Sequence, residues 1–155
     1  MKLHPPCNFY FMREGESIWT AKDSPVFDGT KKIVASKWDF NGKTVEIYKS
    51  DKHSGGVYFD EHADFIFAGS IPDWLSKEII FLNFDGTERS CISIPKLTCD
   101  SQPDKGFFYW LDGAQNQQAW VLLDDGSGIF DKNTYRVLFD TVTEEVLSFE
   151  WTRLR

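Results

Sequence analysis

The sequence is poor in the residues that build metal centres and disulfide frameworks. Its 155 residues include only three histidines and three cysteines, Cys7, Cys91 and Cys99. An odd number without C-x-x-C spacing argues against a disulfide framework and against a zinc knuckle. A Cys91–Cys99 bridge stays open as an alternative, and three reduced thiols in a cytoplasmic protein are the simpler interpretation.

Long apolar segments are also missing. No stretch approaches the roughly 18 apolar residues that a membrane span requires. Residues 1–7 lack the apolar core of a secretory signal. The net charge of −7 repels the phosphate backbone of nucleic acids, and it favours either a cationic partner or simple solubility. We therefore expect no membrane and no nucleic acid among the partners, and a cytoplasmic location.

Catalytic signatures are equally scarce. The sequence has no phosphate loop and no dinucleotide fingerprint. Residues 126–128 (Gly-Ser-Gly) do not form a G-x-S-x-G nucleophile elbow. A catalytic triad would need one of His4, His53 or His62 beside a nucleophile, and no spacing supports that. The expectation is a protein without catalytic residues, metal or cofactor.

Glycine-containing turn dipeptides, in contrast, punctuate the chain. Asn, Asp and Gly tolerate the positive φ angles of tight hairpin turns. The dipeptides are Asp28-Gly29, Asn41-Gly42, Gly55-Gly56, Asp85-Gly86, Asp112-Gly113 and Asp125-Gly126. Each stands beside a short apolar or aromatic run, which predicts an antiparallel β-protein.

About ten short strands are expected in one all-β domain over residues 1–155, arranged as a sandwich, meander or barrel. Besides the two hairpins described next, the candidates are residues 17–20, 56–59, 64–68, 106–111, 118–123, 135–140 and 146–152. Residues 70–77 are the one expected short helix, with Ser70 as its cap and Pro72 in its first turn. Residues 142–149 could be helical, but apolar alternation favours a strand. A propeller is a less favoured alternative, because the repeat period is irregular.

The clearest hairpin spans residues 33–49 around Asn41-Gly42. A two-residue turn there places apolar residues on one face and an opposite-charge pair on the other. The expected partners are Phe40 with Lys43, Trp38 with Val45, Ser36 with Ile47, Asp39 with Thr44 and Lys37 with Glu46.

A second hairpin is expected over residues 79–94 around Asp85-Gly86. Its first arm, residues 79–82 (Ile-Ile-Phe-Leu), is apolar on both faces. Such a strand is typical of the centre of a structure, where both faces are covered.

One segment could bind a metal. In an extended strand Asp60, His62 and Asp64 would share a face, and one histidine with two carboxylates can hold zinc or iron. A metal-dependent enzyme using His62 is therefore an alternative function. A solvated hairpin loop explains the same residues.

Aromatic residues offer another alternative. Six tryptophans and the run of residues 107–110 (Phe-Phe-Tyr-Trp) could include a platform for sugar rings or another small ligand. A strand buried on both faces explains the run equally well, whereas an exposed aromatic patch would mark a binding surface.

The size, acidity, Asp-Gly hairpins and missing catalytic residues resemble the immunity proteins of bacterial polymorphic and contact-dependent toxin systems. The resemblance implies a non-enzymatic protein that binds and blocks a cognate toxin domain, and the acidity of the chain suits a basic one. Carboxylates would speed the encounter with such a partner, and aromatic anchors would hold it. The candidate contact residues are Asp60, Glu61, Asp64, Asp124 and Asp125, with Tyr109 or Trp110 as the anchor.

Overall fold

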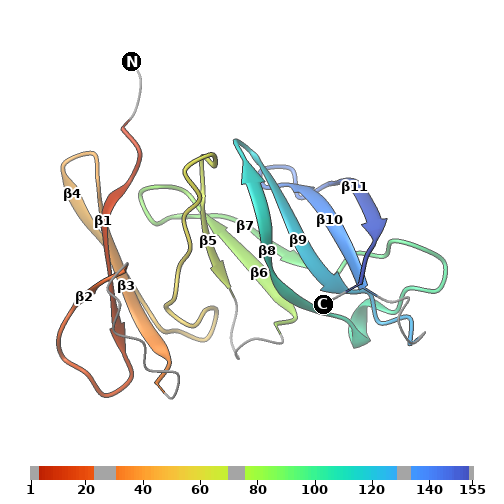
Figure 1. The fold of residues 1–155 in the computed structure, drawn as a ribbon, viewed down its shortest axis with the longest axis horizontal. Coiled ribbons are helices and arrows are strands. Elements are labelled where there is room, and N and C mark those ends of the chain that lie inside the picture. The colour runs from red at the N-terminus through yellow and green to blue at the C-terminus, as the bar shows by residue number, and fades with distance from the viewer. Residues whose placement is uncertain (1–3, 23–30, 70–75, 129–133, 154–155) are drawn as a thin grey trace.

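The computed structural model describes residues 4–22, 31–69, 76–128 and 134–153. Within these residues the chain forms eleven β-strands and one short 3-10 helix, η1 (Figure 1). The elements are β1 (Cys7–Arg13), β2 (Thr20–Ala21), β3 (Ile33–Phe40), β4 (Lys43–Tyr48), β5 (Ile66–Gly69), β6 (Glu78–Leu82), β7 (Glu88–Ser93), η1 (Pro103–Lys105), β8 (Phe107–Gln115), β9 (Gln118–Asp124), β10 (Thr134–Asp140) and β11 (Val146–Trp151).

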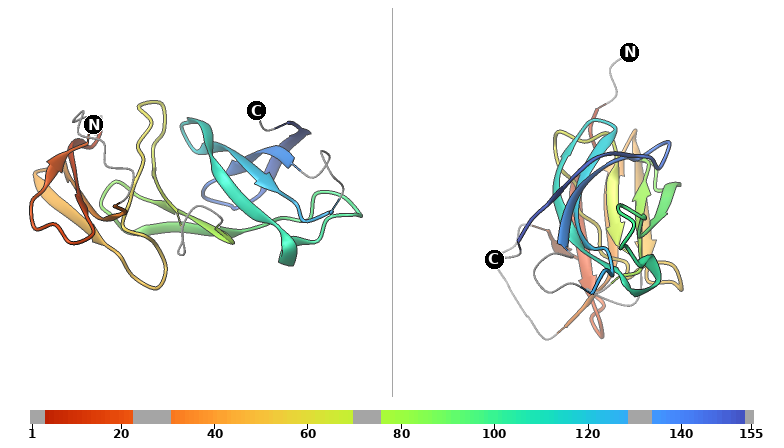
Figure 2. Two further views of the ribbon diagram at one scale, coloured as in Figure 1. Left: turned by 60° about the horizontal axis from the view of Figure 1, so that its bottom comes forward. Right: turned by 90° about the vertical axis from the view of Figure 1, so that its right-hand side faces the viewer.

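The strands form three antiparallel sheets that follow one another along the long axis of the molecule (Figures 1 and 2). The first sheet has the order β2-β1-β3-β4, the central one β5-β6-β7 and the last one β11-β10-β9-β8. This architecture confirms the expected antiparallel β class, and in the described part of the chain no sheet closes into a barrel.

The central sheet is buried on both faces. Ile79 and Phe81 of β6 join a core cluster shared with the last sheet, whereas Ile80 and Leu82 join a second cluster around Trp38 of the first sheet. Successive side chains of a strand point to opposite faces, so β6 contributes to two cores. Its unbroken apolar run predicted this position correctly.

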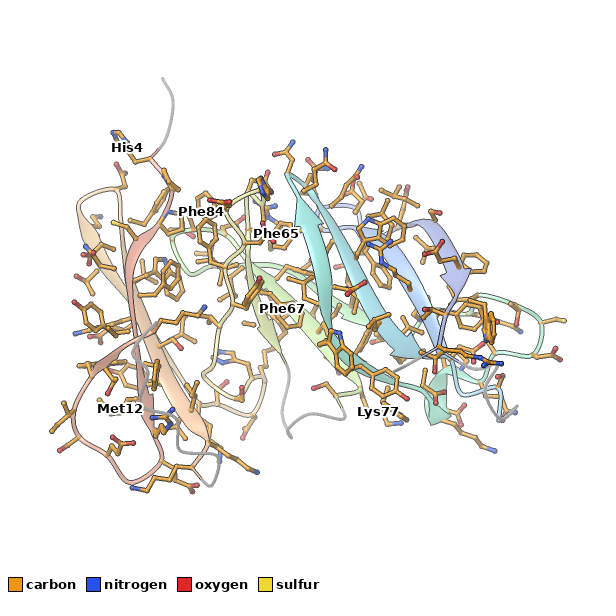
Figure 3. The ribbon with its side chains drawn as sticks, in the orientation of Figure 1. His4, Met12, Phe65, Phe67, Lys77 and Phe84 are labelled. Atoms are coloured by element: carbon orange, nitrogen blue, oxygen red, sulfur yellow. The ribbon has the colours of Figure 1, made fainter. Side chains whose placement is uncertain are left out.

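The same division holds for the aromatic residues beside the central sheet. Phe65 and Phe67 pack against Phe81 on the side of the last sheet, and Phe84 stacks edge-on against Phe40 on the side of the first sheet (Figure 3). The sheets are therefore joined by side-chain packing on both faces of the central layer.

The β3–β4 hairpin has the register that the sequence predicts. All five expected cross-strand pairs occur, from Phe40–Lys43 to Ser36–Ile47. Asn41 and Gly42 have φ angles of 52° and 76°, which a two-residue turn of this hand requires. Val146–Trp151 is a strand, as the alternation in its sequence indicated.

Other predictions were wrong in detail. Asp112-Gly113 lies inside β8, where the register with β9 shifts, and the turn falls at Asn116, whose φ is 46°. An Asp-Gly pair therefore accommodates a bulge here, because glycine also suits irregular strand geometry. The expected strand 56–59 contributes only a bridge at Tyr58, and the expected strand 17–20 is paired only at Thr20.

Two further segments, β1 and residues 70–77, complete the comparison with the sequence-based expectation. The first strand, β1, was not predicted, because Phe9 and Phe11 alternate too briefly to stand out beside prolines. Of the expected helix over residues 70–77, residues 70–75 lie outside the described residues, and Ser76 forms a bridge with Phe108.

Candidate binding surface

Several hairpin turns from all three sheets lie at one end of the molecule, at the top of Figure 1. They are the turns β3–β4, β6–β7, β8–β9 and β10–β11, together with the loop that precedes β5. Loops held by a rigid scaffold are common sites of binding. This end is therefore the first place to look for a functional surface.

Negative charge concentrates at this end. We define the acidic tip surface as the seven carboxylate residues of the β6–β7 turn, the β10–β11 turn and the loop before β5. They are Asp60, Glu61, Asp64, Asp85, Asp140, Glu144 and Glu145. Among the described residues, the side chain of Arg89 reaches into this set, and Lys43 lies beside Asp85 at its edge. Since the whole chain has a net charge of −7, much of that charge is displayed at one end.

Backbone N–H groups fix three of these carboxylates. Asp60 Oδ1 accepts a hydrogen bond of 2.8 Å from the N–H of His62. Asp85 Oδ1 accepts one of 3.0 Å from Thr87, and Asp140 Oδ1 accepts one of 2.9 Å from Thr143. Such bonds hold the three carboxylate oxygens in fixed positions.

The pKa values follow from these bonds. The pKa of Asp140 is below its ordinary value mainly because the backbone N–H of Thr143 donates to it. The pKa of Asp85 is also lowered, chiefly by the hydroxyl of Thr87 and then by that residue's N–H. Both groups are therefore ionised at neutral pH.

Arg89 connects three of the segments. Its Nη1 lies 2.7 Å from Asp64 Oδ1 and 3.2 Å from Thr141 Oγ1, and its Nε donates to Asn83 Oδ1 at 2.9 Å. Its Nη2 also donates to the backbone oxygen of Asp64 at 2.9 Å. Only 14% of the Arg89 side chain is exposed. The guanidinium fork thus holds the loop before β5 to the β6–β7 and β10–β11 turns.

The β8–β9 turn is tied into the same end. Asn116 donates its N–H to the oxygen of His62 and accepts from the N–H of Asp64. Gln117 donates through Nε2 to Asp140 at 2.9 Å and accepts from the N–H of Thr141. Segments far apart in the sequence therefore form one hydrogen-bonded surface.

A groove of about 390 Å³ lies beside this network, between the β3–β4 and β6–β7 turns. Its lining combines the apolar Phe40 and Val45 with the polar Asn41, Lys43, Thr44 and Asp85. A concave site with an apolar base and a charged rim suits a single inserted side chain of a partner.

The candidate carboxylates predicted from the sequence fall into two groups. Asp60, Glu61 and Asp64 lie together at the tips, where the Glu61 side chain is 85% exposed and that of Asp64 is 41% exposed. Asp124 and Asp125 are only 8% and 0% exposed.

The Asp124–Asp125 pair has an internal role. Asp125 accepts from the hydroxyl of Ser101 at 2.8 Å and from the N–H of Ser127 at 3.0 Å. Asp124 accepts from Gly126 at 2.7 Å, and burial is the main cause that raises its pKa. These carboxylates hold loops at the end of β9, so the contact set proposed below omits them.

The two candidate anchors lie on β8, away from the tips. Trp110 is 49% exposed and Tyr109 is half-buried, whereas Phe108 lies in the core. Asn116 is six residues further along, so Trp110 is roughly 20 Å from the turn at about 3.3 Å per residue.

The aromatic rings of β8 do not form a flat platform. Phe107 and Tyr109 meet at 73°, and Tyr109 and Trp110 meet at 62°. A sugar ring stacks on a single plane or a coplanar row. Of the four rings in this run, Trp110 is the one that is exposed, so the run offers a single ring to a sugar.

The metal-binding alternative lacks a ligand set among the described residues, which contain no group of three His, Cys, Asp or Glu side chains placed to hold an ion. His62 is 70% exposed, with Glu61 3.6 Å away. Asp60 and Asp64 are engaged by a backbone N–H and by Arg89. The three residues of the predicted site therefore do not converge.

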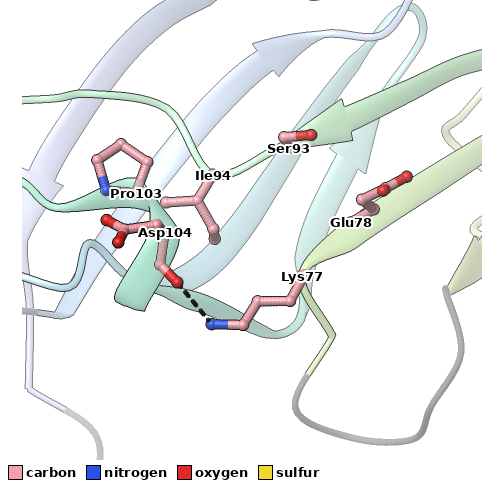
Figure 4. A pocket seen from close by; sticks show the side chains of 6 residues that line it. All are labelled: Lys77, Glu78, Ser93, Ile94, Pro103 and Asp104. Atoms are coloured by element: carbon pink, nitrogen blue, oxygen red, sulfur yellow. Dashed lines mark hydrogen bonds between the residues drawn. The ribbon is translucent and has the colours of Figure 1, made fainter.

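A second cavity, of about 380 Å³, lies near Lys77 at the end opposite to the hairpin turns (Figures 3 and 4). Lys77 Nζ donates to the backbone oxygens of Asp104 and Gly106 at 3.3 and 2.6 Å. Glu78 accepts from Cys91 Sγ at 2.8 Å. Because Lys77 and Glu78 already have partners, this cavity is a poor ligand site.

The three cysteines are free, so Cys91 and Cys99 are not bridged. Across the described ranges, no helix is long and apolar enough to cross a membrane.

Comparison with known proteins identifies a similar fold. The chain resembles a chain in the solved structure of Tne2 in complex with Tni2, with a TM-score of 0.66 over 96% of this chain and 99% of that one. The sequences are 14% identical, so the likeness concerns the fold alone. No protein-family model and no curated protein matches the sequence.

Proposed function

We propose that this protein is an immunity-type inhibitor, which binds a cognate basic toxin domain through the acidic tip surface in the bacterial cytoplasm. Its action is steric: it covers the working surface of the toxin and performs no chemistry itself. The observation that carries the proposal is the set of seven carboxylates at one end, where the guanidinium of Arg89 is already bonded to Asp64.

Electrostatics explains how such a surface would act. A patch of one sign steers an oppositely charged partner and raises the association rate. Carboxylates that are already fixed by N–H groups, as in Asp60 and Asp140, lose little conformational entropy on binding. The surface therefore combines long-range attraction with a preformed shape.

Most of the binding free energy would come from less polar contacts. The groove between Phe40 and Asp85 accepts one side chain of the partner, and a few desolvated contacts of this kind dominate binding energy. Tyr109 and Trp110 remain candidates for a second contact area on β8.

One resemblance and one structural comparison support a protein-binding role. The sequence resembles toxin-immunity proteins in charge and turn pattern, and the fold resembles a chain from a complex of two proteins, Tne2 and Tni2. We also propose that the chain is one domain, because both core clusters include residues of the same central sheet. A single rigid body suits an inhibitor that acts by covering a surface.

The test begins with affinity capture of the partner from a lysate of the native source, followed by kinetics with the purified partner. The charge reversal Glu61→Lys/Glu144→Lys changes two exposed tip residues for which the structure shows no fixing hydrogen bond. The matched control, Glu14→Lys/Asp51→Lys, changes the net charge equally at exposed positions away from the tips.

The tip variant should associate about tenfold more slowly and with a weaker salt dependence, since steering acts mainly on the association rate. The control should lose much less, because its charges lie beyond a Debye length of about 8 Å from the tips. Equal losses in the two variants would show that net charge, and not the acidic tip surface, governs the encounter. Capture of no basic protein would count against the proposal as a whole.

A further inference from the structure

The groove between the β3–β4 and β6–β7 turns has walls that other contacts hold in place. A Cβ atom added at Gly86 would lie 2.6 Å from Val45 Cγ1, so the β6–β7 turn rests directly against β4. The indole N–H of Trp38 donates to the backbone oxygen of Phe84 at 2.8 Å. The rings of Phe40 and Phe84 meet edge-on, with their centroids 5.4 Å apart. The groove is therefore preformed, and a ligand would not have to order it first.

One carboxylate of this groove has an oxygen available to a ligand. Asp85 Oδ1 accepts two hydrogen bonds from Thr87, one of 3.0 Å from its N–H and one of 2.6 Å from its hydroxyl. No hydrogen bond from another described residue goes to Asp85 Oδ2. Lys43 lines the same groove, but these two described residues form no ion pair. The second oxygen of Asp85 can therefore accept from a donor outside the chain.

The rest of the lining determines which donor fits. Phe40 and Val45 supply apolar atoms at the base of the groove. Asn41 adds a second acceptor, because its side-chain amide has no hydrogen-bond partner among the described residues. A long side chain with an apolar stem and a cationic head matches this combination of an apolar base, a carboxylate and an amide.

Arginine suits the groove better than lysine does. Its guanidinium presents five donors in one plane, so that it can reach Asp85 and Asn41 together, and it is more weakly hydrated than an ammonium group. The same plane packs well against an aromatic ring such as that of Phe40. An acidic side chain would meet Asp85 as a like charge. An uncharged one would displace water from the carboxylate without replacing its hydrogen bonds in full.

We propose that this groove is a specificity site that takes one arginine side chain of the partner. The guanidinium donates to Asp85 Oδ2 and to the Asn41 amide oxygen, and the stem lies on Val45. The acidic tip surface attracts any basic protein, whereas the groove selects a partner that carries arginine at the matching position. The assignment of that arginine to a toxin rests on the proposed function, but the preference for a guanidinium group belongs to the chain alone.

The first test needs no partner and uses N-acetyl-arginine amide as the probe. In an NMR titration of the purified chain, the backbone amides of residues 40–45 and 85–87 should shift, with a dissociation constant of about 1–10 mM. N-acetyl-citrulline amide has nearly the same shape without the charge. It should bind at least about tenfold more weakly, because hydrogen bonds between charged groups are the stronger ones. Equal binding of the two probes, or shifts confined to residues outside the groove, would overturn the proposal.

Three variants separate the groove from the charge of the chain as a whole. Asp85→Asn keeps an Oδ1 acceptor for Thr87 and removes the charge, so it should weaken binding of the arginine probe about tenfold. Phe40→Leu keeps the base apolar but removes the ring, and a loss of about threefold is expected. The matched control, Asp51→Asn, removes one exposed carboxylate away from the groove and should change binding by less than about twofold. Undiminished binding of the probe to Asp85→Asn would count against the site.

The captured partner allows a second test by double-mutant cycles. Asp85→Asn combined with Arg→Lys changes in the partner should reveal a coupling of about tenfold for one arginine. If the partner binds Asp85→Asn as tightly as the wild type, the arginine site is refuted while the proposed function stands. If no basic protein is captured but the probe binds in the groove, the proposed function is refuted and the guanidinium site stands.

Discussion

Replacing Arg89 with methionine should destabilise the protein more than any other change of a charged side chain at the hairpin tips. Arg89 makes four hydrogen bonds, two of them to Asp64. Methionine retains the apolar stem that packs beside the Phe65 ring, whose centroid lies 5.8 Å from the guanidinium carbon. The change therefore removes the charge and the donors but little volume.

The size of the effect follows from burial. Breaking a buried ion pair by removing one partner costs about 3–5 kcal/mol. Arg89 is 14% exposed, but Asp64 is 41% exposed and would regain water, so we expect a loss of about 2–3 kcal/mol. For a chain of this length, that loss lowers the melting temperature by about 5–10 °C.

Thermal unfolding followed by circular dichroism measures this loss, with Lys52→Met as the matched control. Lys52 pairs with Glu88 at 3.1 Å, but its side chain is 68% exposed. Exposed pairs contribute about 0–1 kcal/mol, so the control should melt within a few degrees of the wild type. If the two variants melted together, Arg89 would not be the connector that its hydrogen bonds indicate.

Two further outcomes are expected. Gly126→Ala should destabilise the protein more than Gly128→Ala: both glycines have φ near 75°, but an added Cβ at Gly126 collides with the backbone oxygen of Gln102, whereas Gly128 has open space. If the melting temperature fell equally in both variants, the collision with Gln102 would contribute nothing. The loss would then come only from placing alanine in the left-handed backbone conformation, which costs about 1–2 kcal/mol at either position. At pH 8 iodoacetamide should label the exposed Cys7 and Cys99 but spare Cys91, because burial raises the pKa of the Cys91 thiol to about 12 and only the thiolate reacts. Mass spectrometry of the digest reads the labels, and modification of Cys91 as fast as Cys99 would contradict that protection.

Local signals in the sequence predicted the fold well where one interaction dominates. The Asn41-Gly42 turn fixes its own register, and the apolar run of β6 requires cover on both faces. Asp112-Gly113 misled because an Asp-Gly pair serves a bulge as readily as a turn. Which of the two forms depends on the pairing of β8 with β9, and that pairing is not local.

The candidate site was only partly predictable for the same reason. Asp60 and Glu61 were identified by their charge, and they do lie at the exposed end. Asp124 and Asp125 look no different in the sequence, yet Ser101 and neighbouring N–H groups enclose them. Arg89 was missed because its partners lie as far as 52 residues away along the chain.

The layering of the sheets explains why the tips can act as one surface. β6 and β7 belong to the sheet that is packed on both faces, so their turn cannot move without disturbing two cores. Arg89, on β7, extends that rigidity to Asp64 and Thr141 in the neighbouring segments. A partner that meets this end therefore meets carboxylates whose spacing is already set, and little entropy is lost in ordering them. It follows that Arg89→Met should weaken partner binding as well as the fold, although Arg89 itself is almost fully enclosed.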